Sequence, residues 1–153
     1  MIKDLIAKLR AQGLTVSTAE SCTGGTIASS ITAVAGASDV FLGGVVSYSN
    51  EAKENILGVS HETLLIHGAV SRQTVRQMVE GACRVLHTDC AVATSGIASP
   101  GGGTPQKPVG TVWMAWKTPA GITTELHHFE GSRAEVIAAA TEKALSRLSE
   151  LIY

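Results

Sequence analysis

The first half of the chain alternates between helical and extended hydrophobic patterns. Apolar residues recur at helical spacing from Ile2 to Leu9, and Gly13 supplies a helix stop. Residues 14–19 alternate apolar and polar side chains as a strand does, and residues 26–35 read as a helix of small residues. The run at residues 40–48 is nearly all apolar, which predicts a buried strand. This order of helices and strands is typical of a parallel α/β arrangement.

The second half adds more helices and one hairpin. Three expected helices begin at capping residues: the first begins at Ser49 or Asn50 and runs to Leu57, the second begins at Ser60 and ends at Gly68, and the third begins at Ser71 and runs to Leu86. Residues 90–94 form a short apolar segment that predicts a strand, and a glycine-rich loop follows it.

The last third of the chain predicts a hairpin and a closing helix. Residues 109–117 and 122–129 look like two strands, and the short turn between them requires antiparallel pairing. Ser132 and Glu135 have the spacing of a capping box, which starts the last helix. The sequence therefore predicts a three-layer α/β/α sandwich with a mixed, mostly parallel sheet and one antiparallel hairpin. We expect a single domain over residues 1–153, because no linker separates two apolar blocks.

Composition excludes several classes of function. The net charge is -1 with no basic run, and the chain has only six aromatic residues, so we expect no nucleic-acid partner. The charge-free stretch at residues 21–38 is rich in Ser, Thr, Gly and Ala and would span a membrane poorly, so we expect no membrane partner. The amino-terminal residues lack a secretory signal, and the three cysteines have neither disulfide nor zinc-ribbon spacing. These features favour a cytoplasmic protein, with a homo-oligomer left open.

Three strand exits are rich in small polar groups. They are residues 20–25, residues 48–53 and the loop after Thr94. In open α/β sheets, ligands bind outside the carboxyl ends of the strands. We therefore expect a polar ligand site where these three segments meet.

Ser21 is the first candidate nucleophile. It lies in a strand-to-helix turn just before Gly24 and Gly25, where backbone N–H groups could hold an oxyanion. Cys22 is a rival, because a helix N-terminus lowers a thiol pKa. None of the five histidines that might serve as the base lies at a strand exit; they are His61, His67, His87, His127 and His128.

Lys53 is the better candidate for the base. It lies near the start of the helix that begins at Asn50, where the helix dipole and partial burial would lower its pKa. Tyr48, five residues earlier, could pass a proton or orient the amine. Glu20 could instead pair with Lys53 and raise its pKa, and a solvated surface role for Lys53 remains the alternative.

Weaker signals concern anion binding. The glycine run at residues 101–103 either cradles a phosphate or forms an ordinary mobile turn. Lys107 and Arg133 either bind anions or are solvated. No cluster of His, Cys and Asp has metal-ligand spacing, so we predict neither a metal nor a cofactor.

Five segments spread over nearly the whole chain have the residue types of known family motifs, namely residues 19–25, 48–53, 67–71, 95–98 and 107–112. In these motifs the sequence closely resembles the CinA C-terminal domain family of nicotinamide-nucleotide amidases. It implies hydrolysis of the carboxamide of nicotinamide mononucleotide to the nicotinic acid nucleotide and ammonia, with Ser21 as the nucleophile, Lys53 as the base and Tyr48 as an assisting group. With the strand exits it gives these expected substrate contacts: Thr23, Gly24, Gly25, Asn50, Ser95, Gly96, Gly102, Lys107 and Arg133.

One position departs from the family pattern. Ser99 stands where the family usually has glycine, and we expect its side chain to narrow the pocket or shift the loop. Longer relatives carry a pyrophosphatase-like amino-terminal domain. The competing function is a non-catalytic nucleotide-binding or partner module of the competence/damage-inducible type. The serine, tyrosine and lysine together favour the amidase, because a binding module needs no nucleophile with a matched base.

Overall fold

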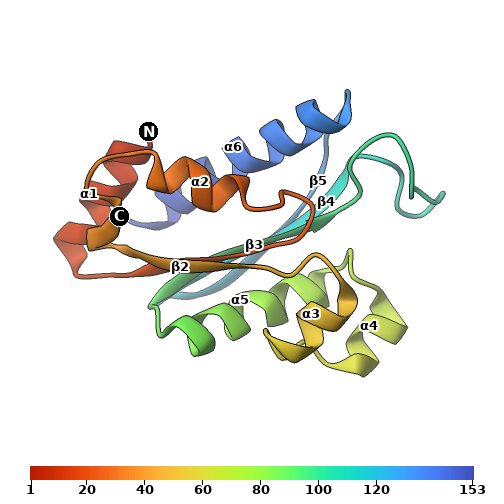
Figure 1. Ribbon diagram of the computed structural model, residues 1–153, viewed down its shortest axis with the longest axis horizontal. Helices are drawn as coiled ribbons and strands as arrows, with labels where there is room; N and C mark the ends of the chain where they lie inside the picture. Colours follow the sequence, from red (N-terminus) through yellow and green to blue (C-terminus); the bar gives the residue numbers. More distant parts are fainter.

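The computed structural model describes residues 1–153 and consists of a five-stranded sheet between two layers of helices (Figure 1). The strands are β1 (Val16–Glu20), β2 (Phe41–Val46), β3 (Cys90–Gly96), β4 (Thr111–Thr118) and β5 (Gly121–His128). The helices are α1 (Ile2–Gln12), α2 (Thr26–Thr32), α3 (Asn50–Asn55), α4 (His61–His67), α5 (Arg72–Leu86) and α6 (Arg133–Leu151), with a 3-10 turn at Ala37–Asp39.

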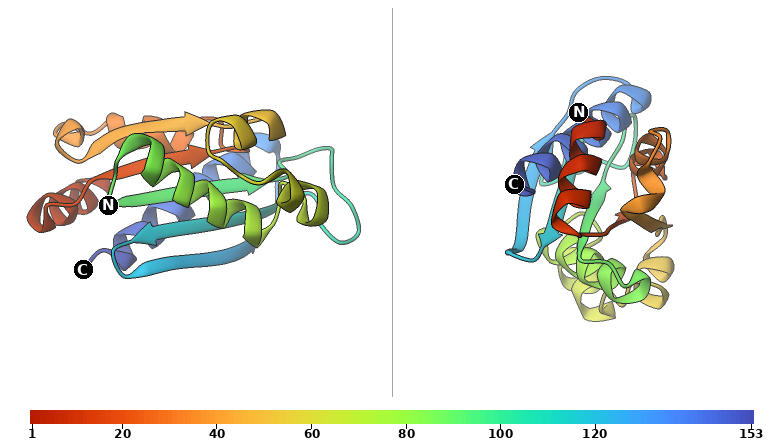
Figure 2. Two further views of the ribbon diagram at one scale, coloured as in Figure 1. Left: turned by 90° about the horizontal axis from the view of Figure 1, so that it is seen from below. Right: turned by 90° about the vertical axis from the view of Figure 1, so that its left-hand side faces the viewer.

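The sheet is mixed, and its strand order is β2-β1-β3-β4-β5. β1 pairs in parallel with β2 and β3, whereas β4 runs antiparallel to both of its neighbours. Helices α1, α2 and α6 cover one face, and α3, α4 and α5 cover the other (Figures 1 and 2). The predicted three-layer sandwich with a mostly parallel sheet is therefore confirmed, and the expected hairpin is β4 and β5.

Two predictions about individual elements were wrong. The segment at residues 40–48 is an edge strand rather than a buried one, and its side chains alternate between half-buried and exposed, with Leu42 49% and Val46 51% exposed. The small-residue helix ends at Thr32, three residues earlier than expected. Apolar composition alone does not distinguish a central strand from an edge strand, since that depends on which strands pair.

Each face of the sheet has its own hydrophobic core. One core packs α1, α2 and α6 on the sheet, and Trp116 lies in it fully buried, with its indole nitrogen donating to the Ala144 carbonyl at 2.9 Å. That bond satisfies the one polar atom of the indole ring and fixes α6 on β4. The other core lies beneath α5 and includes Leu57, which follows α3.

Helix α5 holds the end of α3 through a close backbone contact. A side-chain Cβ at Gly81 would lie only 2.0 Å from the Leu57 carbonyl oxygen, so only glycine permits this approach. The Arg84 guanidinium donates to the same carbonyl at 2.9 Å, and the Val59 N–H donates to the Lys53 carbonyl at 3.0 Å. The backbone of Lys53 is thereby tied to the core beneath α5.

Candidate active site

The carboxyl ends of β1, β2 and β3 lie together at one end of the sheet, as we expected from the three polar segments that follow these strands. The Ser21 N–H donates to the Thr94 carbonyl at 3.0 Å, and the Ser47 N–H donates to the Glu20 carbonyl at 2.8 Å. The ladder of hydrogen bonds therefore continues just past β1 and ties the Ser21 backbone to β3. The loop from residue 97 to residue 110 extends beyond this end of the sheet (Figure 2, left).

Lys53 is almost fully buried and contacts Ser21. Its Nζ lies 3.0 Å from the Ser21 Oγ, 2.9 Å from the Ser47 carbonyl oxygen and 3.3 Å from the Tyr48 carbonyl oxygen, and the residue is 1% exposed. Side chains on a helix lean toward its N-terminus, so the lysine on α3 reaches back to the end of β2. Ser49 sets this geometry by capping α3, its hydroxyl accepting from the Ala52 N–H at 3.0 Å.

The three partners of Nζ match both protonation states of the amine. Carbonyl oxygens only accept, so Ser47 and Tyr48 take two N–H groups in either state. The third direction, toward the Ser21 hydroxyl, is an N–H in the ammonium form and a lone pair in the neutral form. Burial lowers the pKa of Lys53 below its usual 10.5, because desolvation disfavours the charged form.

Glu20 does not pair with Lys53, contrary to the alternative considered from sequence. Its Oε1 accepts from the Ile27 N–H at 2.9 Å and from the Thr23 hydroxyl at 2.6 Å, and its Oε2 accepts from the Ala28 N–H at 3.0 Å. The carboxylate therefore binds the first N–H groups of α2, where the helix dipole favours a negative charge. Glu20 is therefore not an ion-pair partner of Lys53, and burial remains the main influence on the pKa of the amine.

The phenol of Tyr48 points away from the amine. Tyr48 is 60% exposed, and its hydroxyl accepts from the Arg133 Nη2 at 2.9 Å, while only its backbone carbonyl contacts Lys53. The Arg133 Nη1 also donates to the Ser99 carbonyl at 3.3 Å. Arg133 thus joins the start of α6, the end of β2 and the glycine-rich loop.

The residues at the carboxyl end of the parallel strands surround a cavity of about 280 Å³. Eight residues expected from the sequence line it, namely Ser21, Tyr48, Asn50, Lys53, Ser95, Gly96, Gly102 and Arg133. Cys22, Ala69, Val70, Ile97, Ala98 and Gly101 line it as well. Most of this second group lies in the family-like motifs. Small and apolar side chains carry no catalytic or charged group, so the sequence alone did not mark them as site residues.

Four residues expected at the site do not line this cavity, and Ser99 does not have the effect expected of it. Thr23, Gly24 and Gly25 do not line it, because Thr23 is buried against Glu20 and Thr94, and the Gly24 N–H already donates to the Ser21 carbonyl at 3.1 Å. Lys107 lies in a neighbouring cavity. Ser99 is absent from the lining, so its side chain does not narrow the pocket.

The rival nucleophile Cys22 is unsuited to its proposed role. It is 7% exposed, and burial raises the pKa of its thiol to about 11. Desolvation outweighs the lowering expected near a helix start, so the thiolate is scarce at neutral pH.

Neither membrane-spanning helices nor metal-ligand clusters are found. No helix has both the length and the apolar character needed to cross a membrane. No three His, Cys, Asp or Glu side chains lie close enough together to hold a metal ion.

The family model described as the CinA C-terminal domain matches residues 1–152. The chain belongs to the CinA C-terminal domain family. The nicotinamide-nucleotide amidohydrolase PncC of Escherichia coli K12 is 51% identical over 141 residues, which are 92% of this chain and 86% of that protein. A CinA-like protein of Syntrophobacter fumaroxidans is 46% identical over 90% of this chain, but this chain spans only 32% of that protein.

Solved structures of the CinA superfamily share the fold. A superfamily protein from Klebsiella pneumoniae 700603 has a TM-score of 0.95 at 40% identity, covering 99% of this chain and 94% of that one. Another from Enterobacter cloacae has a TM-score of 0.96 at 37% identity, covering 99% of this chain and 90% of that one.

Proposed function

We propose that this protein is a nicotinamide-nucleotide amidase, which hydrolyses the carboxamide of nicotinamide mononucleotide to the nicotinic acid nucleotide and ammonia in pyridine nucleotide salvage. The observation that carries the proposal is the 3.0 Å contact between the buried Lys53 Nζ and the Ser21 Oγ, two residues that line one cavity. The similarity to PncC of Escherichia coli supports the choice of substrate.

In this mechanism Lys53 acts as a neutral amine. Two carbonyl oxygens hold its N–H groups, so its lone pair faces the Ser21 hydroxyl and accepts that proton as Oγ attacks the carboxamide carbon. The resulting ammonium then donates a proton to the departing nitrogen, and ammonia leaves. Water attacks the acyl-serine ester with Lys53 again as the base, which releases the carboxylate product and restores Ser21.

The other cavity residues have binding roles in this proposal. Asn50, Ser95, Gly96 and Gly102 contact the substrate, and Arg133 fixes the Tyr48 phenol at the cavity wall. Tyr48 assists by its backbone carbonyl, which orients the amine, and by its ring, which bounds the substrate. Thr23, Gly24 and Gly25 support the turn that presents Ser21.

The test is ammonia release by the purified protein from nicotinamide mononucleotide. We expect the wild type to release one ammonia per nucleotide consumed, and Ser21→Ala to abolish turnover, because no other cavity side chain combines a nucleophile with a neutral base. Circular dichroism of the variant checks that it is folded. Full activity in folded Ser21→Ala would exclude the serine mechanism, and no release by the wild type would exclude the amidase.

A further inference from the structure

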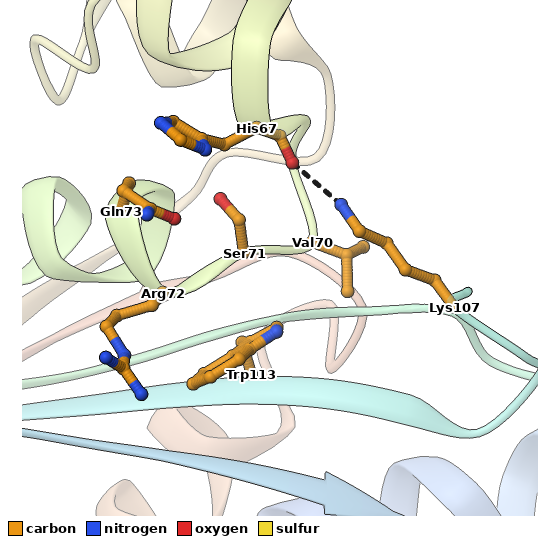
Figure 3. A pocket seen from close by; sticks show the side chains of 7 residues that line it. All are labelled: His67, Val70, Ser71, Arg72, Gln73, Lys107 and Trp113. Atoms are coloured by element: carbon orange, nitrogen blue, oxygen red, sulfur yellow. Dashed lines mark hydrogen bonds between the residues drawn. The ribbon is translucent and has the colours of Figure 1, made fainter.

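A second cavity of about 320 Å³ lies beside the catalytic cavity and has a basic lining (Figure 3). Val70 lines both cavities, and the loop that contributes Gly102 to the catalytic cavity contributes Lys107 to this one. Arg72 and His67 also line it, and none of its seven lining residues is acidic. We call it the basic cavity.

The two permanent charges of the basic cavity have no carboxylate partner. The Lys107 Nζ donates to the His67 carbonyl at 2.7 Å, and the Arg72 guanidinium lies over the Trp113 ring, 5.4 Å from its centroid (Figure 3). Neither side chain takes part in any of the salt bridges of the structure. A carbonyl and an aromatic ring orient these cations without neutralising them, so an anion in the cavity would meet two positive charges held in place.

Helix α5 adds to the positive potential. It has 15 residues and begins at Arg72, and its cap Ser71 accepts from the Thr74 N–H at 3.2 Å. The N–H groups of Arg72 and Gln73 precede the first intrahelical bond, which runs from the Val75 N–H to the Ser71 carbonyl. The positive end of the helix therefore faces the same cavity as Arg72 and Lys107.

We propose that the basic cavity is the phosphate subsite of the substrate, which binds the 5′-phosphate of the nucleotide while the carboxamide lies at Ser21. This inference rests on the proposed function, since it assigns the far end of the same substrate. Lys107 and Arg72 contact the phosphate oxygens, and Trp113 holds Arg72 in position. Arg133 is the rival ligand, since it too has no carboxylate partner, but it is one charge on the wall of the catalytic cavity, whereas the basic cavity offers two.

The first test compares nicotinamide mononucleotide with nicotinamide riboside, which lacks the phosphate. The readout is the ratio of kcat/KM for the two substrates. We expect this ratio to fall about tenfold or more in Arg72→Gln and in Lys107→Met, because each removes a charge-assisted hydrogen bond to phosphate. Arg76→Gln is the matched control, since Arg76 is an exposed arginine one turn further along the same helix that does not line the basic cavity, and its ratio should stay unchanged.

The outcomes decide between two positions for the phosphate. A ratio that falls in Arg133→Gln while it persists in Arg72→Gln and Lys107→Met places the phosphate at Arg133 and overturns the proposal. An equal fall in Arg76→Gln also overturns it, because the effect would then come from overall charge.

A second test does not depend on hydrolysis. Ribose 5-phosphate carries the phosphate without the amide, and its binding is measured by calorimetry. We expect about tenfold weaker binding to Arg72→Gln and Lys107→Met than to the wild type and to Arg76→Gln. Equal binding to all four proteins would refute the subsite even if the amidase is real. Selective weakening in a protein that hydrolyses no nicotinamide nucleotide would support the subsite and refute the proposed function.

Discussion

Glu20, the last residue of β1, and Lys53, on α3, are two ionisable residues that are equally buried, each being 1% exposed. Glu20 receives two backbone N–H groups and one hydroxyl, so its negative charge is fully satisfied by the start of α2. Lys53 contacts two carbonyls and one hydroxyl and has no carboxylate partner. The same burial therefore makes one group a fixed structural anchor and leaves the other a titratable amine.

The largest expected effect comes from removing the titratable amine. We expect Lys53→Arg and Lys53→Met each to lower kcat for nicotinamide mononucleotide by about 10²–10⁴-fold, because a guanidinium stays protonated and a thioether has no basic nitrogen. Steady-state ammonia release, corrected for the folded fraction, gives the measurement. If Lys53→Arg keeps most of the activity, the lysine acts only through its positive charge. The contrast between a titratable Lys53 and a structural Glu20 would then be wrong.

The anchor should respond in stability instead. In Glu20→Gln one acceptor becomes an NH₂ group that faces an N–H of α2, so we expect the free energy of unfolding in urea to fall by about 2–3 kcal/mol. Activity per folded molecule should change little. Glu51→Gln is the control, because Glu51 is an exposed acid in the first turn of α3 and should cost well under about 1 kcal/mol. Equal losses in both variants would mean that Glu20 is not the anchor.

The titration of Lys53 should also appear in the stability of the protein. Because burial lowers its pKa in the folded state, the unfolded chain binds more protons between that lowered pKa and 10.5, and stability rises with pH in this window. We expect the wild type to gain on Lys53→Met by up to about 1.4 kcal/mol per pH unit there. Urea unfolding of both proteins between pH 6 and pH 10 gives the difference. A difference independent of pH would show that the folded and unfolded lysines have the same pKa.

The smallest effect is expected at Cys22. Its thiol has a pKa raised to about 11, so Cys22→Ser should retain activity within about tenfold, and iodoacetamide at pH 7 should not inactivate the wild type. Activity and labelling are measured on the same samples. Rapid inactivation that the Cys22→Ser variant escapes would indicate an exposed, reactive thiol and an open cavity.

The sequence predicted the helices and strands well, and it also predicted the end of the sheet at which the site lies. Periodicity and capping residues placed each helix and strand within a few residues, and the small polar groups after β1, β2 and β3 marked the cavity. The edge position of β2 was beyond reach, because it depends on pairing between distant segments.

The roles of single residues depended on side-chain directions that spacing does not reveal. Tyr48 and Lys53 are close in sequence, yet the phenol turns to Arg133 while only the backbone carbonyl meets the amine. Glu20 is adjacent to Ser21, yet its carboxylate accepts a hydrogen bond from the Ile27 N–H of α2 rather than one from Lys53. The hydrogen bond from Lys53 to the Ser47 carbonyl could not be predicted either, because every residue has a backbone oxygen and the sequence does not show which one the amine meets.

The close approach of Gly81 to Leu57 means that the position of Lys53 depends on packing outside the cavity. A methyl group at position 81 would act as a wedge behind α3, because the Leu57 carbonyl it displaces belongs to the turn that is bonded to the Lys53 backbone. Relief of that 2.0 Å contact requires the Leu57 turn to move, and the bonded Lys53 backbone would move with it. In a directed-evolution experiment, the rate of the proposed amidase should therefore respond to substitutions on α5 that never touch the substrate.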